Sequence, residues 1–564
     1  MSLSDLIAVA RGDRPADTLL KNARIINVLA GTIEKGNVAL YDRYIAGIGD
    51  YSEAGQVIDL RGAYLAPGFI DGHVHIESSM LHPCQFARAV VPHGTTSICT
   101  DLHEITNVAG LDGIRFVLNS TRRVPLDLFF QVASCVPSTH METAGAVIGR
   151  AEVSRLLKWK NNVGLGEMMN YPGVVNAFPP VIDELEAAQG HVIAGHAPGL
   201  RGRQLNAYIA AHISSDHETT DLEEGREKLS RGLYLMIREG TTAKNLETLL
   251  PLVSDGNWPR CMFVSDDRSC SDLLRDGHID AILRRAIELG LDPVRAIQLV
   301  TSNPARYFRL HDLGYIAPGA RANLVTFTSL EKIDIDMVFY NGRLTARQGE
   351  YLGTVTSATP QKLTHSIHVR PFDTEALQLK IERDEFPVIE LIPGQIITRK
   401  KMIRVGRGIF HPDTEKDLLK AVVVERHRAT GNIGLGVVKG FGIRSGAIAS
   451  TVAHDSHNIV AVGSSDADIM AAIKAIVEMQ GGLVACKDGE VIARLPLPVC
   501  GLLATGDAAE VSRRFEQLEK TASRLGKLPP APFALLSFIA LPVIPELRLT
   551  DMGIVDVLQF KIIS

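Results

Sequence analysis

Histidines and carboxylates recur in this sequence at the ends of short apolar segments. His73 and His75 end the segment 65–75. In a strand, residues i and i+2 project from the same face, so both imidazoles can reach one site. Later segments end in further residues of the same two kinds: Glu167, His196, His217 and Asp266. Because imidazole and carboxylate ligands suit Zn, Fe or Mn, we predict that these six residues bind metal.

Eight apolar segments follow one another between residues 65 and 267, separated by amphipathic or mixed helical stretches. Short apolar strands that alternate with helices are typical of parallel β/α units. The eight segments are 65–75, 95–103, 126–134, 163–170, 191–197, 211–217, 233–239 and 261–267. Eight repeats fit a closed barrel better than an open sheet, so we predict a (β/α)8 TIM barrel over residues 66–313. Barrel enzymes build their active sites at the C-terminal ends of the strands, where the six candidate ligands fall.

The regions on either side of the predicted barrel have a different pattern of apolar and turn residues. Short β-type segments with Gly and Asp turns fill residues 18–65, and similar segments return after residue 313. We therefore predict a small discontinuous β-sandwich domain formed by residues 1–65 and 314–358. A stretch rich in Thr, Ser, Pro and His at 355–375 indicates a linker, and residues 359–564 mix strands with helices, which predicts a C-terminal α+β domain.

The composition favours small-molecule chemistry in the cytoplasm. A net charge of −5 and a pI of about 6.4 provide no broad attraction to nucleic acid or to an anionic membrane. The seven cysteines form no CxxC pair, which is typical of reduced thiols. The N-terminus has no signal-peptide pattern, and the longest apolar segment, 533–544, is too short to span a bilayer. We expect a cytoplasmic protein that binds neither nucleic acid nor membrane.

The motifs around the candidate ligands resemble the amidohydrolase superfamily. The phrases that carry this resemblance over about residues 18–358 are APGFIDGHVH and TSNPARYFRLHDLGYIAPGARANLV. A closer resemblance, to the bacterial adenine deaminase family, extends over nearly the whole chain. It is carried by DGHVHIESSM (71–80), GEMMNYPGVV (166–175), AGHAPGL (194–200), SSDHETT (214–220), VSDDR (264–268), ATGNIGLGVVKGFGI (429–443) and AIASTVAHDSHNI (447–459). This resemblance implies hydrolysis of adenine to hypoxanthine and ammonia, with a small purine as substrate and a homodimer as the assembly.

The resemblance also implies how the ligands are shared between two metals. Many amidohydrolases carry a carboxylated lysine on the fourth strand, and Glu167 stands at that position here. A glutamate can bridge two metals directly, so the resemblance implies two divalent ions (Mn, Fe(II) or Zn). One would be held by His73, His75, Glu167 and Asp266, and the other by Glu167, His196 and His217. Asp266 would take a proton from the attacking water and pass it to the departing amine.

Several other polar residues lie next to these ligands. Glu77 and Glu218 are the candidates for the acid that protonates the purine ring. The residues that would bind substrate or orient the ligands are Asp101, His103, Glu104, Asp267 and Arg238. The cluster 101–104 could instead bind another metal, and Arg238 could instead have a surface role. In the third domain, the spacing within the segment 454–457 (HDSH) would allow metal binding; the other interpretations are a polar, hydrogen-bonded turn and a contribution to the barrel mouth.

Other functions fit parts of the same pattern. The same ligands would serve an amidohydrolase acting on an N6-substituted adenine or on a cyclic amide or imide. A barrel kept only as a binding module would be expected to lack some ligands, and all of the expected ones are present. The combined HxE and PCxxC arrangement of the small zinc deaminases that act on nucleic-acid bases is absent.

Overall fold

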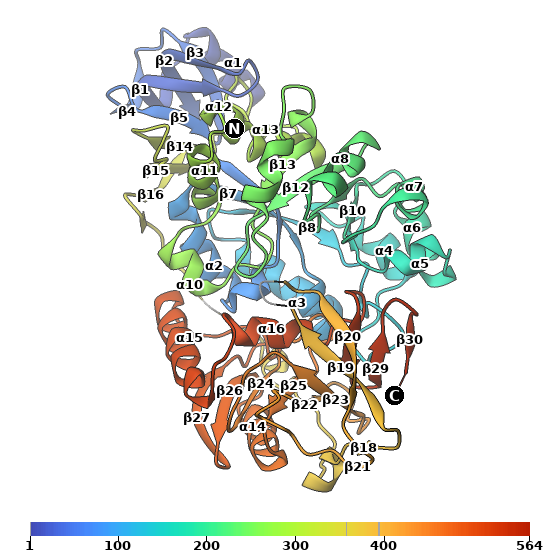
Figure 1. The fold of residues 1–564 in the computed structure, drawn as a ribbon. Helices are drawn as coiled ribbons and strands as arrows, with labels where there is room; N and C mark the ends of the chain where they lie inside the picture. Colours follow the sequence, from blue (N-terminus) through green and yellow to red (C-terminus); the bar gives the residue numbers. More distant parts are fainter. Residues whose placement is uncertain (1, 357, 393–394, 564) are drawn as a thin grey trace.

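The computed structural model describes residues 2–356, 358–392 and 395–563. Residues 1, 357, 393–394 and 564 fall within the predicted small β domain and C-terminal domain and lie outside the described residues. Three regions follow one another along the molecule, with the N-terminal strands at one end, an α/β region in the middle and the C-terminal sheet at the other end (Figure 1). Within the described residues, no helix is long and apolar enough to cross a membrane.

The middle region contains eight strands that pair only in parallel. One sheet has the order β10-β9-β8-β7-β6 and a second has the order β11-β12-β13. The strands are β6 (Phe69–Val74), β7 (Thr95–Asp101), β8 (Asp127–Val132), β9 (Asn162–Met168), β10 (Ile193–Gly195), β11 (Ser215–Asp216), β12 (Tyr234–Arg238) and β13 (Cys261–Val264). The two sheets also meet at their edges, because Val74 bridges to Asp266 and the Ser214 N–H donates to the Ile193 carbonyl at 2.9 Å.

Helices follow these strands in alternation, which confirms the predicted β/α pattern of this region. They include α2 (Pro83–Val90), α3 (His103–Thr121), α4 (Arg150–Leu156), α6 (Pro179–Ala187), α7 (Gly202–Ala210), α8 (Leu222–Ser230), α10 (Cys270–Arg275) and α11 (Ile279–Glu288). Apolar side chains from several strands form a core between the sheets. This core includes Ile70, Cys99, Met236, Met262 and Val264, all buried.

The N-terminal strands join a later part of the chain in one nine-stranded sheet. Its main order is β17-β16-β15-β14-β5-β1-β2-β3, and β4 pairs with β1. The strands are β1 (Ala16–Asn27), β2 (Thr32–Tyr41), β3 (Tyr44–Gly49), β4 (Ala54–Asp59), β5 (Tyr64–Pro67), β14 (Leu324–Phe327), β15 (Ile335–Tyr340), β16 (Arg343–Arg347) and β17 (Glu350–Tyr351). The N-terminal strands thus pair, through β5 and β14, with strands that follow the parallel α/β region.

The prediction of a single strand over 65–75 was wrong, because the chain changes sheets at Gly68. Tyr64–Pro67 pairs with β1 and β14, whereas Phe69–Val74 pairs with β7. A β-carbon at Gly68 would lie 2.3 Å from the hydroxyl oxygen of Thr96. The crossover therefore needs a residue without a side chain, and hydrophobic periodicity does not detect such a crossover.

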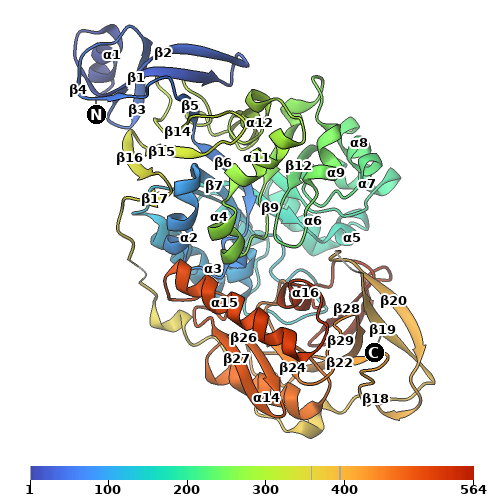
Figure 2. The ribbon, with the colours of Figure 1, turned by 60° about the vertical axis from the view of Figure 1, so that its left-hand side comes forward.

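The C-terminal region has an eight-stranded sheet of order β20-β19-β23-β22-β25-β24-β26-β27 and a smaller sheet of β28, β29 and β30. The strands are β19 (Glu385–Leu391), β20 (Thr398–Arg404), β22 (Leu419–Val424), β23 (Ile433–Lys439), β24 (Ala447–Ser450), β25 (Ile459–Gly463), β26 (Gly482–Lys487), β27 (Glu490–Pro496), β28 (Leu547–Thr550), β29 (Gly553–Asp556) and β30 (Lys561–Ile562). Helix α14 (Asp466–Glu478) packs on the large sheet, while α15 (Ala508–Ala522) also contacts α2 and α10 of the middle region. Figure 2 shows α15 and α16 (Pro532–Phe538) on the side that faces the middle region.

Candidate active site

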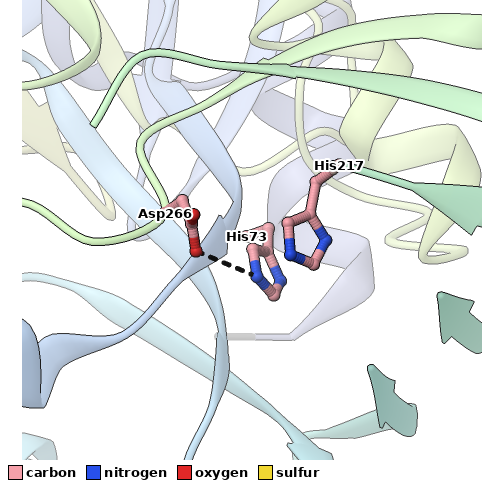
Figure 3. Close-up of side chains that lie close together, drawn as sticks. All are labelled: His73, His217 and Asp266. Atoms are coloured by element: carbon pink, nitrogen blue, oxygen red, sulfur yellow. Dashed lines mark ion pairs between the residues drawn. The ribbon is translucent and has the colours of Figure 1, made fainter. Parts of the chain in front are cut away.

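The six predicted metal ligands converge at the C-terminal ends of the parallel strands. His73 lies in β6 and Glu167 in β9. His75, His196 and His217 directly follow the ends of strands, and Asp266 lies two residues after the end of β13. Each of the six is at most 4% exposed. Figure 3 shows His73, His217 and Asp266 with their side chains directed toward one another. The structure thus brings together residues that are up to 193 positions apart (73 to 266) in the sequence.

Four of these residues form a first donor set: His73, His75, Glu167 and Asp266. The Nε2 atoms of His73 and His75 are 3.2 Å apart. Asp266 Oδ1 lies 3.4 Å from the first of these nitrogens and 3.3 Å from the second. Glu167 Oε1 lies 3.2 Å from His75 Nε2 and 3.9 Å from His73 Nε2. Four donor atoms therefore surround one point.

The second donor set consists of Glu167, His196 and His217. Glu167 Oε2 lies 2.7 Å from His196 Nδ1 and 3.1 Å from His217 Nε2. Its other oxygen belongs to the first set, so this one carboxylate spans both groups. The ring of His217 also stacks on His73 with a centroid distance of 4.1 Å.

Asp71 and Asp101 hold the strand ends in position. Asp71 Oδ1 accepts hydrogen bonds from the backbone N–H groups of His73 and Ser265, each at 3.2 Å, and so connects β6 to the end of β13. Asp101 Oδ2 accepts the backbone N–H of Glu167 at 2.9 Å. Asp101 thus positions the backbone of a proposed ligand, and the sequence patterns did not single out Asp71. Its place two residues before His73 on the same strand face was the signal that could have found it.

Arg238 connects the carboxylates of Glu218 and Asp266. It donates to both oxygens of Glu218, with Nη2 at 2.6 Å from Oε2, and its Nη1 donates to Asp266 Oδ2 at 2.7 Å. The other oxygen of Asp266, Oδ1, faces His73 and His75. One oxygen of this carboxylate therefore contacts the arginine and the other contacts the two histidines. Asp266 also has a left-handed backbone with φ of 54°, a conformation that is tolerated at sites whose surroundings hold it in place.

The charges of this cluster keep the two shared carboxylates ionised. Burial acts to raise the pKa of Glu167, but the charge of His217 and the contact with His196 outweigh it and hold that pKa well below its ordinary value. Burial likewise acts against ionisation of Asp266, and Arg238 with His73 and His75 lowers its pKa far below normal. Anionic carboxylates are the form that binds a cation.

A buried lysine supports the strand ends that carry the second donor set. Lys228 Nζ lies 2.9 Å from Asp216 Oδ2 and 2.6 Å from Glu224 Oε1, and it donates to the Ala197 carbonyl at 2.7 Å. Asp216 also accepts the backbone N–H of Ala197 at 2.8 Å. This network fixes the residues next to both histidines of the set. This network could not be predicted, because no pattern in the sequence pairs a lysine of α8 with the end of β11.

The C-terminal region reaches the site through His454. Its Nδ1 lies 2.6 Å from Glu104 Oε1, and its ring stacks on Phe538 with a centroid distance of 4.5 Å. The segment 454–457 therefore contacts the strand ends, which agrees with a contribution from this segment and leaves its role in metal binding open.

A cavity of about 270 Å³, the junction cavity, lies between the two regions. Its walls include Ser78, Met80, Asp267, His454, Phe533 and Phe538. The two phenylalanines come from α16 and give the cavity an aromatic wall. They were not among the predicted site residues, because the sequence does not show which face of that helix meets the strand ends.

The candidate acids have different surroundings. Burial first, and then the charge of Glu104, raises the pKa of Glu77 to about 7, and one of its oxygens accepts the Ile105 N–H. Glu218 is held by the arginine described above. Asp267 lines the junction cavity, and burial together with the neighbouring charge of Asp266 raises its pKa. Asp267 is thus a carboxyl group that has a raised pKa and borders an open space.

The two donor sets suit divalent metal ions in chemistry and in spacing. Two ligands at about 2.0–2.1 Å from one ion, at a tetrahedral angle, lie about 3.3 Å apart. The first set has four contacts between 3.2 and 3.4 Å. The described residues also contain overlapping groups of His and carboxylate whose ligand atoms lie within 4.8 Å of one another, among them His73 with His75 and Glu167. The arrangement can hold two cations with Glu167 between them.

Comparisons with protein families agree with this architecture. The model of the amidohydrolase family matches residues 64–345, which contain all six predicted ligands. A strand-end cluster of histidines and carboxylates on an α/β fold, together with this match, places the chain among the amidohydrolases. A second model, the adenine deaminase C-terminal domain, matches residues 395–561.

Full-length relatives narrow the family further. The chain is 55% identical to an adenine deaminase of Dehalococcoides mccartyi, over 100% of this chain and 99% of that protein. It is 45% identical to adenine deaminase 2 of Carboxydothermus hydrogenoformans, and 41% identical to an adenine deaminase of Kosmotoga olearia, each over 100% and 99%. The chain belongs to the adenine deaminase family, which confirms the resemblance found in the sequence.

Solved structures similar to this chain are more distant. A β-aspartyl dipeptidase from Fervidobacterium islandicum AW-1 is 18% identical, with a TM-score of 0.45, over 60% of this chain and 98% of that one. A D-aminoacylase is 17% identical, with a TM-score of 0.43, over 60% and 98%.

Proposed function

We propose that this protein hydrolyses adenine to hypoxanthine and ammonia at a site with two divalent cations. The observation that carries the proposal is the position of Glu167, whose two oxygens face two separate donor sets. Membership of the adenine deaminase family over the whole chain supports adenine as the substrate.

The proposed ligands are the residues of the two donor sets. His73, His75 and Asp266 would hold one ion, His196 and His217 the other, and Glu167 would bridge them. When bound, divalent metals supply a nucleophilic water whose pKa lies near neutrality. Zn, Fe(II) and Mn all accept imidazole and carboxylate ligands, so the donor set leaves the choice among them open.

We propose that protons move through two neighbouring carboxylates. As the C6–O bond forms, Asp266 takes a proton from the attacking water and later passes it to the amine as the C6–N bond breaks. Arg238 holds this carboxylate in place. Asp267 is better suited than Glu218 to protonate the ring, because it borders the junction cavity and has a raised pKa, whereas both oxygens of Glu218 accept hydrogen bonds from Arg238. Glu77 remains a second candidate, with a pKa raised to about 7 by burial.

The junction cavity is the proposed place for the purine. Purine rings stack on aromatic side chains, and Phe533 and Phe538 offer such a surface next to Asp267 and His454. Enclosure between two regions of the chain would also exclude water from the reacting carbon.

The finer architectural predictions are part of this proposal. We propose that β6–β13 form one closed (β/α)8 barrel at residues 66–313, flanked by a discontinuous β-sandwich (1–65 and 314–358) and by the α+β domain (359–564). The edge contacts between the two parallel sheets support closure of the barrel. A homodimer and a cytoplasmic location stay predictions.

A direct assay tests the proposed reaction. The protein is purified with manganese supplied and iron restricted, and the loss of adenine is followed by ultraviolet absorbance alongside the release of ammonia. We expect equal amounts of both, abolished by Glu167→Gln and unchanged by Glu184→Gln, a matched substitution on α6 away from the site. A metal-loaded protein without turnover would refute adenine as the substrate. N6-substituted adenines and cyclic amides or imides would then be screened for release of ammonia or amine.

A further inference from the structure

A separate group of four ligand-type atoms lies where the C-terminal region meets the strand ends. We call it the junction cluster: His103 and Glu104 at the start of α3, and His454 and Asp455 between β24 and β25. His103 Nε2 lies 3.2 Å from Glu104 Oε1 and 3.6 Å from Asp455 Oδ1. His454 Nδ1 lies 2.6 Å from Glu104 Oε1 and 3.8 Å from Asp455 Oδ1. The four donors thus form a closed ring of contacts.

The size of this ring suits one cation. Ligands at about 2.0–2.1 Å from a tetrahedral ion lie about 3.3 Å apart, and the four contacts range from 2.6 to 3.8 Å around that value. The first donor set spans a similar range, 3.2 to 3.9 Å. Two imidazoles and two carboxylates are a common ligand combination for zinc, manganese or ferrous iron.

The polar atoms of the junction cluster are only partly satisfied by hydrogen bonds. His103, Glu104 and Asp455 are each at most 2% exposed, and among the described residues Asp455 Oδ2 has no hydrogen-bond partner. Glu104 Oε2 is in close contact with His457 Nε2, and the nearest carboxylate oxygens to His103 Nδ1 are 3.5 Å away. Within the described parts of the chain, neither carboxylate of the cluster forms an ion pair with Lys or Arg. Buried carboxylates without a fixed cation are costly, and a bound metal ion removes that cost.

His103 stands between the junction cluster and the first donor set. While its Nε2 faces the cluster, its Nδ1 lies 3.5 Å from Glu167 Oε1 and 3.5 Å from Asp101 Oδ1. Ligand histidines commonly place a carboxylate at the ring nitrogen that does not bind the metal. His103 has the arrangement of a ligand histidine whose ring is oriented by carboxylates near its other nitrogen.

We propose that the junction cluster binds a third divalent cation, held by His103, Glu104, His454 and Asp455 and separate from the pair that shares Glu167. This ion links the C-terminal region to the strand ends, because each side supplies two ligands. It lies beside the junction cavity, which His454 lines. A wall of the proposed substrate cavity thereby depends on the ion.

Metal counting tests the proposal without any assay of activity. Protein loaded with manganese and freed of excess metal by gel filtration is analysed by mass spectrometry of its metal content. We expect three equivalents in the unaltered protein, two in Asp455→Asn and three in Asp551→Asn. The last is a matched control, because Asp551 is also a buried carboxylate at this junction but binds Thr143 through hydrogen bonds.

A second measurement covers the case in which Asp455→Asn does not fold. Crystals of the unaltered, manganese-loaded protein should show three anomalous scattering peaks, one of them between His103 and Asp455. Two equivalents in solution, or no anomalous peak at the junction cluster, would overturn the proposal. An inactive protein with three ions would instead refute the proposed reaction and leave the third site in place.

Discussion

Replacing Arg238 with methionine tests whether the orientation of Asp266 controls the reaction. Arg238 donates to Asp266 Oδ2 at 2.7 Å, and the opposite oxygen of this carboxylate belongs to the first donor set. A hydrogen bond to a charged group contributes about 1.5–3 kcal/mol. If all of this is lost from the transition state, kcat/KM for adenine falls roughly 10- to 150-fold, since about 1.4 kcal/mol corresponds to a factor of ten.

The same substitution leaves the buried carboxylate of Glu218 without its cation, which affects stability rather than catalysis. The double variant Arg238→Met/Glu218→Gln removes that charge. We expect it to regain most of the lost Tm while staying as impaired in kcat/KM as the single variant, with two equivalents of metal retained at the donor sets. Full activity in Arg238→Met with unchanged metal content would refute the role assigned to the arginine.

Three other substitutions test the structure at separate places. Lys228→Met should lower the free energy of unfolding by about 3–5 kcal/mol in chemical denaturation, because it leaves the buried carboxylate of Asp216 without its cation. The double variant Lys228→Met/Asp216→Asn should recover most of the lost free energy of unfolding. A loss below about 1 kcal/mol in Lys228→Met would contradict the stabilising role of this ion pair. Burial raises the pKa of Glu142 to about 8, so between about pH 5 and 8 the folded state holds a proton that the unfolded state has lost. The free energy of unfolding of the unaltered protein should therefore fall with rising pH, relative to that of Glu142→Gln, by up to about 1.4 kcal/mol per pH unit. Parallel plots of the free energy of unfolding against pH for the two proteins would disprove this prediction. Phe538→Ala should raise KM for adenine roughly 5- to 150-fold if stacking contributes about 1–3 kcal/mol, whereas an unchanged KM would place the purine elsewhere.

The proposed ligands could be identified from the sequence because the signal for them is local. His73 and His75 share a strand face through their two-residue spacing, and parallel strands bring their C-terminal ends to one edge. Knowledge of each strand end was therefore enough to predict that Glu167 and Asp266 approach them. The same reasoning would have included Asp71, had the two-residue pattern been followed one step back along the strand.

Contacts between distant elements could not be predicted in this way. Glu104 and His454 are 350 residues apart, and no periodicity in either segment indicates that they meet. The aromatic wall of the junction cavity depends on how α16 is turned, which follows from packing of the whole C-terminal region. The crossover at Gly68 depends on the side chain of Thr96, a contact between two strands rather than a property of one.

The charge at the strand ends connects the proposed ions to one another. Eight carboxylates lie together there, all but Asp267 buried: Glu77, Asp101, Glu104, Glu167, Glu218, Asp266, Asp267 and Asp455. In the described chain, Arg238 is the one lysine or arginine that forms an ion pair with any of them.

Together with Arg238, two divalent ions supply five positive charges against eight carboxylates, which leaves an excess of three negative charges if all eight are ionised. The proposed third ion at the junction cluster would lower that excess to one. Burial and neighbouring negative charges raise the pKa of Glu77 and of Asp267, so proton uptake at one of them would offset the last charge. Clustered carboxylates thus take one of two states, bound to a cation or protonated, and the cost of buried charge decides between them. A carboxyl group with a raised pKa beside the junction cavity is the proton donor that we propose for the purine ring, so occupancy of the cation sites and acid catalysis would depend on the same balance of charge.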